Sequence, residues 1–94
     1  MSTSSRINPK DLFTVLITQL TSSAWSQLGV TANPLTGKKE INLDAAVMTI
    51  GILEALLFKT VGNLNKSEDK FLSESVRDLK LSLMKTSNGK TENK

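Results

Sequence analysis

The chain has 94 residues, 38% of them hydrophobic and 22% charged, and its 12 Lys and Arg residues against 9 Asp and Glu residues give a net charge of +3. This length allows one small domain, and the absence of Cys and His excludes disulfides, thiolate sites, the commonest transition-metal ligand and the easiest general base near neutral pH. We therefore expect no metal and no cofactor. The lack of an apolar signal segment or of 18 consecutive apolar residues favours a cytoplasmic protein without a membrane span.

The first predicted helix covers residues 9–28. Residues 1–7 before it are rich in Ser and Thr and are expected to form a flexible tail. Asn8 is a suitable cap, Pro9 fits the first helical position, and Gly29 is a suitable stop, because glycine tolerates a left-handed backbone. The predicted core face consists of apolar residues at helical spacing, with Ile17 beside them: Phe13, Leu16, Leu20, Ala24 and Leu28.

The end of this helix, LTSSAWSQLG, holds the only Trp of the chain in a stretch without charge. Trp25 lies about 100° around the helix from Ala24, so it flanks the core face instead of centring it. Protein interfaces are depleted of charged residues and enriched in Trp. We therefore interpret Trp25 as an interface residue, with the alternative that it closes the end of its own core.

An ordered turn is predicted at residues 33–37, Asn-Pro-Leu-Thr-Gly, because Pro presets the backbone angle and Gly relieves a strained position. The apolar or β-branched residues on either side of it, Val30, Thr31 and Ile41, would permit a small hairpin.

The second predicted helix covers residues 43–61, with Asn42 as its cap. One face carries Leu43, Ala46, Val47, Ile50, Leu53 and Leu57, and the other sides carry Met48, Ile52, Ala55, Leu56 and Phe58. A helix that is apolar nearly all round is expected to be surrounded by protein. Gly51 costs about 1 kcal/mol relative to Ala in a helix interior, which we interpret as close packing against a neighbouring helix.

The third predicted helix covers residues 66–85 and starts with a capping box formed by Asn65 and Glu68. Its apolar stripe consists of Leu72, Val76, Leu79 and Leu83. Residues 87–94 are polar and without pattern, so they are expected to form a flexible tail. The whole pattern predicts an all-α protein in which residues 8–86 form one domain of three helices.

Four sequence patterns occur in order along the chain. They are SA-x-x-x-LG (Ser23, Ala24, Leu28, Gly29), NP-x-TG (Asn33, Pro34, Thr36, Gly37), NL-x-x-A (Asn42, Leu43, Ala46) and I-x-IL-x-x-L-x-x-KT-x-GNL (Ile50, Ile52, Leu53, Leu56, Lys59, Thr60, Gly62, Asn63, Leu64). The chain thereby resembles a small bacterial family of domains of unknown function, whose members are short and all-helical. The resemblance covers about residues 10–84. It implies a bacterial origin and a helical fold, and it carries over no activity and no catalytic residue.

Two alternatives to an interaction protein remain open. Glu54 is the single acid in the apolar stretch 45–58, and burial would raise its pKa, which would favour an enzyme or ligand carrier centred on it. The competing interpretation places Glu54 on an exposed strip or in a pair with a lysine. The second alternative is a nucleic-acid adaptor that uses Lys38, Lys39 and the basic residues of the third helix. Acidic residues interleaved through that helix argue against a basic face.

A non-catalytic protein–protein interaction module is the function that the sequence favours. The second helix has only two other helices to cover it, and the first has an uncharged outer side. We expect a homodimer, or docking on another protein, through these two helices, with nucleic acid disfavoured as a partner and no membrane span. The candidate interface residues are Trp25, Leu28, Met48, Ile52 and Phe58.

Overall fold

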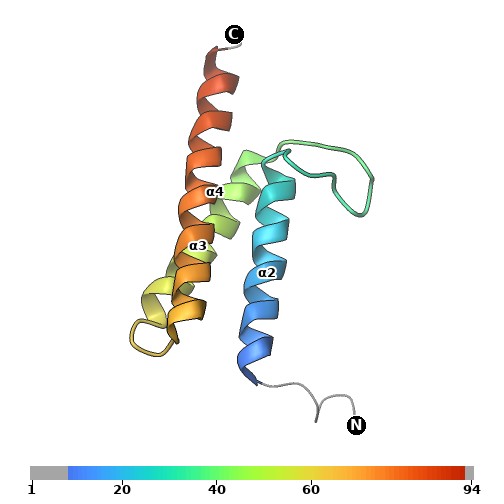
Figure 1. Cartoon of the computed structure of the whole chain (residues 1–94). Coiled ribbons are helices and arrows are strands. Elements are labelled where there is room, and N and C mark those ends of the chain that lie inside the picture. Colours follow the sequence, from blue (N-terminus) through green and yellow to red (C-terminus); the bar gives the residue numbers. More distant parts are fainter. Residues whose placement is uncertain (1–8, 93–94) are drawn as a thin grey trace.

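Residues 9–92 are described by the computed structural model, and they form three helices without a strand (Figure 1). The helices are α2 (Pro9–Gln27), α3 (Leu43–Lys59) and α4 (Lys66–Glu92). The chain reverses direction at each connection, so α3 runs antiparallel to both α2 and α4 (Figure 1). The predicted all-α, three-helix fold is confirmed. The predicted tail at residues 1–7 and the predicted cap Asn8 lie outside the described residues.

The end of α2 is a glycine-terminated cap. The Gly29 amide donates to the Ser26 carbonyl and the Val30 amide to the Trp25 carbonyl, both at 3.0 Å, and Gly29 has φ +80°. These two bonds define the Schellman motif, which satisfies the last carbonyls of a helix. The predicted stop at Gly29 is confirmed.

The connection between α2 and α3 is held together by Asn33. Its carbonyl accepts from the amides of Thr36 and Gly37, and its Oδ1 accepts from the Leu35 amide at 2.8 Å. These bonds order the predicted turn. The possible hairpin around it forms no strands within residues 9–92, although two bonds join its arms, from the Asn33 amide to the Lys38 carbonyl at 2.8 Å and from the Asn42 amide to the Gln27 carbonyl at 2.7 Å. One antiparallel bridge, between Leu28 and Ile41, is the β-type pairing within residues 9–92.

Side-chain caps open α3 and α4. The Ala45 amide donates to Asn42 Oδ1 at 3.1 Å. The Glu68 amide donates to Asn65 Oδ1 at 2.8 Å, and the Asn65 amide donates to Glu68 Oε1 at 3.1 Å. The predicted cap and the predicted capping box are both confirmed, since each satisfies amides that the first turn leaves without a carbonyl.

The ends of α3 and α4 differ from the prediction. α3 stops at Lys59. Thr60 caps it, since its hydroxyl donates to the Leu56 carbonyl at 2.6 Å, and the chain then turns at Gly62, with φ +84°. α4 continues to Glu92 instead of ending at Lys85. Once a helix exists, each further residue adds one backbone hydrogen bond, and no proline interrupts residues 86–92. The polar composition that predicted a tail is therefore compatible with a helical end.

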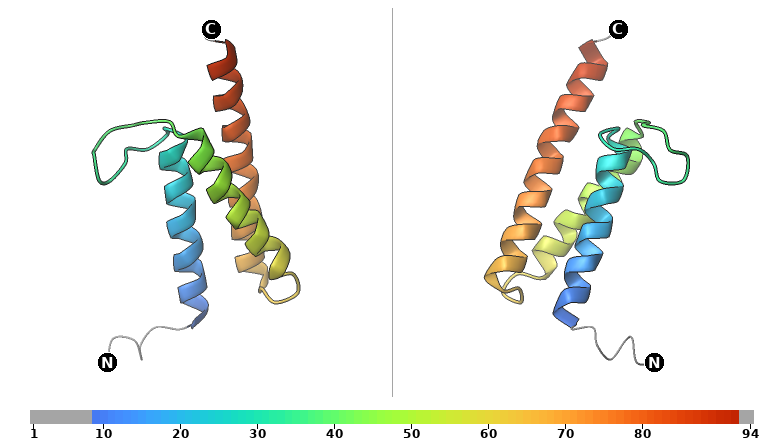
Figure 2. Two further views of the ribbon diagram at one scale, coloured as in Figure 1. Left: turned by 180° about the vertical axis from the view of Figure 1, so that it is seen from behind. Right: turned by 45° about the vertical axis from the view of Figure 1, so that its right-hand side comes forward.

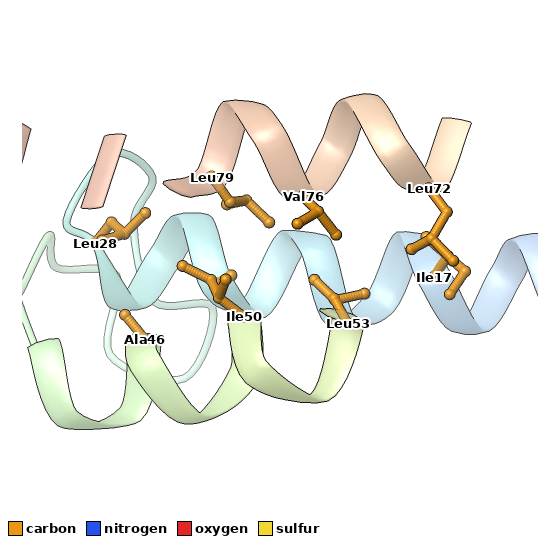
Figure 3. Close-up of a cluster of buried hydrophobic side chains, with 9 residues drawn as sticks. Ile17, Leu28, Ala46, Ile50, Leu53, Leu72, Val76 and Leu79 are labelled. Carbon is orange, nitrogen blue, oxygen red and sulfur yellow. The ribbon is translucent and has the colours of Figure 1, made fainter. Parts of the chain in front are cut away.

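The hydrophobic core lies where the three helices meet (Figure 3). Its buried residues are Ile17, Ala24 and Leu28 near or on α2, Ala46, Ile50 and Leu53 on α3, and Leu72, Val76 and Leu79 on α4. Burial of such side chains is the main favourable term in folding. The stripe predicted for α4 is confirmed, with Leu83 packed at its edge. On α2 the predicted face is shifted, since Ile17 is fully buried and Leu16 is exposed.

The buried side of α3 is narrower than its apolar composition predicts. Thr49 is buried, and its hydroxyl donates to Gln27 Oε1 of α2 at 2.7 Å. Val47, which the sequence assigned to the core face, is exposed. A straight helix packed against two neighbours on one side keeps its other side free, so the core contacts and the Thr49 bond fix which residues of α3 face outward.

Candidate functional site

An apolar surface runs along the side of α3 that faces away from the core. We call it the outer face of α3 and define it by Val47, Met48, Gly51, Ile52, Ala55 and Phe58, all of which are exposed. Viewed from behind, α3 lies in front of α2 and α4, and no other segment crosses it (left view of Figure 2). The spacing of four and three residues from Met48 to Phe58 keeps these residues on one side of the helix.

The side chains of the outer face are substantially open to solvent. Met48 is 69% exposed, Phe58 77% and Val47 55%. The prediction that this helix is surrounded by protein is therefore wrong for the isolated chain, because two helices cover only one of its sides. The prediction that Gly51 packs against a neighbouring helix is also wrong, since a Cβ there would meet nothing within 4 Å.

An open groove of about 630 Å³ between α3 and α4 borders the outer face. The apolar side chains that line it are Leu57, Phe58, Val61, Val76, Leu81 and Met84. Phe58 belongs to both surfaces, so the apolar area continues from the outer face of α3 across the groove to α4. Contiguous exposed apolar area of this kind marks interaction sites in proteins.

Glu54 lies at the edge of this groove and is paired. Its Oε2 accepts from Lys80 Nζ of α4 at 2.6 Å, and the two side chains are 44% and 53% exposed. Glu54 is therefore not buried, which was the reason for proposing a site centred on it. Of the two interpretations, the structure agrees with the pairing of Glu54 with a lysine. The lysine comes from another helix, which spacing along α3 alone did not indicate.

Two of the five candidate interface residues lie with the core instead of on the surface. Leu28 is buried, and Trp25 is partly buried and packs against the core cluster. Trp25 also accepts the Val30 amide bond of the Schellman motif, which is often accompanied by an apolar contact between these two positions. The other three candidates, Met48, Ile52 and Phe58, lie together on the outer face of α3.

The uncharged hydroxyl side of α2 faces the connecting loop. A cleft of about 430 Å³ separates them, and it is lined by Ser22, Ser23, Ser26, Gln27 and residues 31–35. No charged residue lines this cleft, so it offers neither a base nor an ion to activate the serines.

Four of the basic side chains considered for nucleic-acid binding lie on a loop or beside an acid. Lys38 and Lys39 are on the loop, Lys80 is paired with Glu54, and Arg77 lies 3.7 Å from Asp78. Among residues 9–92 no group of three or more acidic side chains is arranged to hold a metal ion. None of the three helices has the length and hydrophobicity needed to span a bilayer.

The outer face contains residues that the sequence reasoning did not select. Gly51 and Ala55 occupy its middle, and Val47 one of its edges. The sequence contained a sign of this surface, because residues 45–53 carry no charge. Periodicity alone did not decide which apolar side of the helix faces the core.

Comparison with known proteins identifies one family. A family model described as "Domain of unknown function (DUF1844)" matches residues 10–85. No curated protein matches the chain, and no solved structure does.

Proposed function

Since the chain belongs to this family of domains of unknown function, we propose its function from its geometry. It is a non-catalytic protein–protein interaction module that binds through the outer face of α3. The resemblance to a bacterial family supports a bacterial cell as the setting.

The observation that carries this proposal is the apolar outer face itself. Large hydrophobic side chains that are exposed outnumber those that are buried among the described residues. The centres of protein interfaces are depleted of charge and enriched in Phe and Met. The outer face has this composition, with Met48 and Phe58 exposed and no charged residue between Met48 and Gly51 or between Ala55 and Phe58.

The chemistry of the exposed polar groups supports a binding role over catalysis. General acid–base and nucleophilic catalysis need a group of suitable pKa held against a nucleophile or substrate. The chain has no His or Cys, the serines of α2 face an uncharged cleft, and Glu54 is engaged by Lys80. A binding surface requires none of these groups.

The test compares the wild type with Ile52→Lys, which places a charge in the outer face, and with Gln19→Lys, which makes the same addition on the exposed side of α2. Self-association is measured by analytical ultracentrifugation up to about 100 μM, a range that detects dissociation constants typical of weak complexes. Association with other proteins is measured by affinity capture from the source cell. Circular dichroism verifies that all three proteins are folded.

We expect the wild type and Gln19→Lys to form the same complex and Ile52→Lys to lose it. A wild type that stays monomeric, and that captures the same proteins as Ile52→Lys, would contradict the proposal.

A further inference from the structure

The two ends of the outer face carry opposite charges. Asp44 lies in the first turn of α3 and Lys59 in its last turn, and both are exposed. Neither takes part in the ion pairs found among the side chains of residues 11–88, which join Arg77 to Asp78 and Lys80 to Glu54. The surface therefore has an acid at one end, a base at the other and apolar residues between.

We propose that a second copy of this chain covers the outer face, with the two α3 helices antiparallel about a two-fold axis. This inference rests on the proposed function and names its partner. In an antiparallel pair centred on Leu53, Asp44 of each chain lies opposite residue 62 of the other, which is three residues, or about 4.5 Å along the helix axis, beyond Lys59. The long lysine side chain spans this offset, so both ends attract. A parallel pair would place Asp44 beside Asp44 and Lys59 beside Lys59, and both ends would repel. A two-fold axis also closes the assembly at two chains.

The sizes of the apolar residues fit the same arrangement. Gly51 and Ala55 are each two residues from Leu53, and Met48 and Phe58 are each five residues from it. An antiparallel pair centred there places Gly51 against Ala55 of the second copy, where the backbones approach closely, and Met48 against Phe58 of the second copy. Sulfur–aromatic contacts of this kind are favourable.

Gly51 supplies a further reason for a close neighbour. A glycine in a helix interior costs about 1 kcal/mol relative to Ala. Within the chain nothing requires it, because a Cβ at Gly51 would meet no atom within 4 Å. The outer face of a second copy, packed against this position, provides the contact that its own chain does not.

The apolar area approaches that of a stable dimer when the second copy covers the adjoining groove together with the outer face. The large exposed side chains of the outer face and the adjoining groove are Val47, Met48, Ile52, Phe58, Val61, Leu81 and Met84. With about 150–200 Å² for each fully exposed side chain, their exposed fractions add up to roughly 750 Å². Stable interfaces bury about 800 Å² per partner.

Charge reversal tests the antiparallel pairing. Asp44→Lys and Lys59→Asp are each expected to weaken self-association about tenfold, because each creates repulsion at both ends of the dimer. An equimolar mixture of the two variants is expected to form a mixed dimer at least tenfold more stable than either variant dimer, since both ends then attract again. Sedimentation with one variant fluorescently labelled measures all three species.

Two matched controls separate pairing from effects on the helices themselves. Asp11→Lys repeats the Asp44→Lys change in the first turn of α2. Lys39→Asp repeats the Lys59→Asp change on the loop. Asp44 and Lys59 also stabilise α3 through its dipole, so each reversal lowers the stability of its own chain. That loss is intrinsic to each chain, and mixing does not reverse it. An equimolar mixture of these two control variants is not expected to gain association.

Each outcome assigns a failure to one proposal. A wild type that is monomeric at about 100 μM overturns the second copy, and the interaction function is then decided by capture of another protein. A dimer that Ile52→Lys abolishes but that shows no preference for the mixed species overturns the antiparallel pairing and leaves the interaction function supported. A dimer that is unaffected by Ile52→Lys overturns both.

Discussion

Gly29 and Trp25 show how the position of one residue is decided by its local backbone. Gly29 has φ +80°, and a Cβ there would lie 2.7 Å from Ile41 Cγ1. The turn that Gly29 makes brings Ile41 over the end of α2 and forms the bridge to Leu28. Trp25, one turn earlier, packs against its own core. The sequence identified Gly29 as the end of the helix, but it did not show that Ile41 packs against this end.

The substitution Gly29→Ala is expected to lower the free energy of unfolding by about 2–3 kcal/mol, because it adds a left-handed backbone strain of about 1–2 kcal/mol and a clash with Ile41. Gly37→Ala is the matched control. Gly37 has φ +73°, but nothing lies within 4 Å of its Cβ position, so only the backbone strain applies. Urea denaturation measures both. Equal losses would show that the contact with Ile41 is unimportant.

At the scale of an element, α3 has two apolar sides with different roles. Leu53 is fully buried between the helices, whereas Met48 is 69% exposed on the outer face. Hydrophobic periodicity identified the helix and most of its buried residues. It placed Val47 on the buried side, however, and did not place Thr49 there. Thr49 can be buried because its hydroxyl donates a hydrogen bond to Gln27 Oε1 of α2. This partner is 22 residues away in the sequence, where local pattern does not reach.

Truncation of Leu53 and of Met48 to alanine is expected to separate folding from association. Leu53→Ala lowers the free energy of unfolding by about 2–5 kcal/mol, since it leaves a cavity in the core. Met48→Ala leaves it within about 0.5 kcal/mol under monomeric conditions, because the side chain is already in water. Met48→Ala instead weakens self-association in ultracentrifugation. A large loss of monomer stability in Met48→Ala would mean that the outer face serves the fold of the single chain.

At the scale of the whole molecule, three helices provide too little protein to enclose the middle one. α2 and α4 meet α3 from one side (left view of Figure 2), and the core that they form with it is small. Chains of about this size bury a limited share of their apolar surface and often depend on oligomerisation for part of their stability. The second copy proposed here covers the side that the chain itself leaves open.

Dimerisation predicts that thermal stability depends on concentration. The melting temperature of the wild type should rise by several degrees for each tenfold increase in chain concentration, because a partner that binds only the folded state stabilises it by mass action. Ile52→Lys should melt at a temperature independent of concentration. Differential scanning calorimetry over a hundredfold range of concentration measures both. A wild-type melting temperature that does not change would argue against a folded-state dimer.

The sequence by itself determined the three helices, their caps at Asn42 and Asn65, the stop at Gly29 and the core stripe of α4, because propensity, capping and periodicity act over a few neighbouring residues. Only the tertiary structure decided which side of α3 is buried, that Lys80 pairs with Glu54, and that Trp25 packs on its own core. These features depend on how helices distant in the sequence approach one another. A helix apolar on all sides specifies that it will be covered, and the packing of its neighbours decides which side is left for a partner.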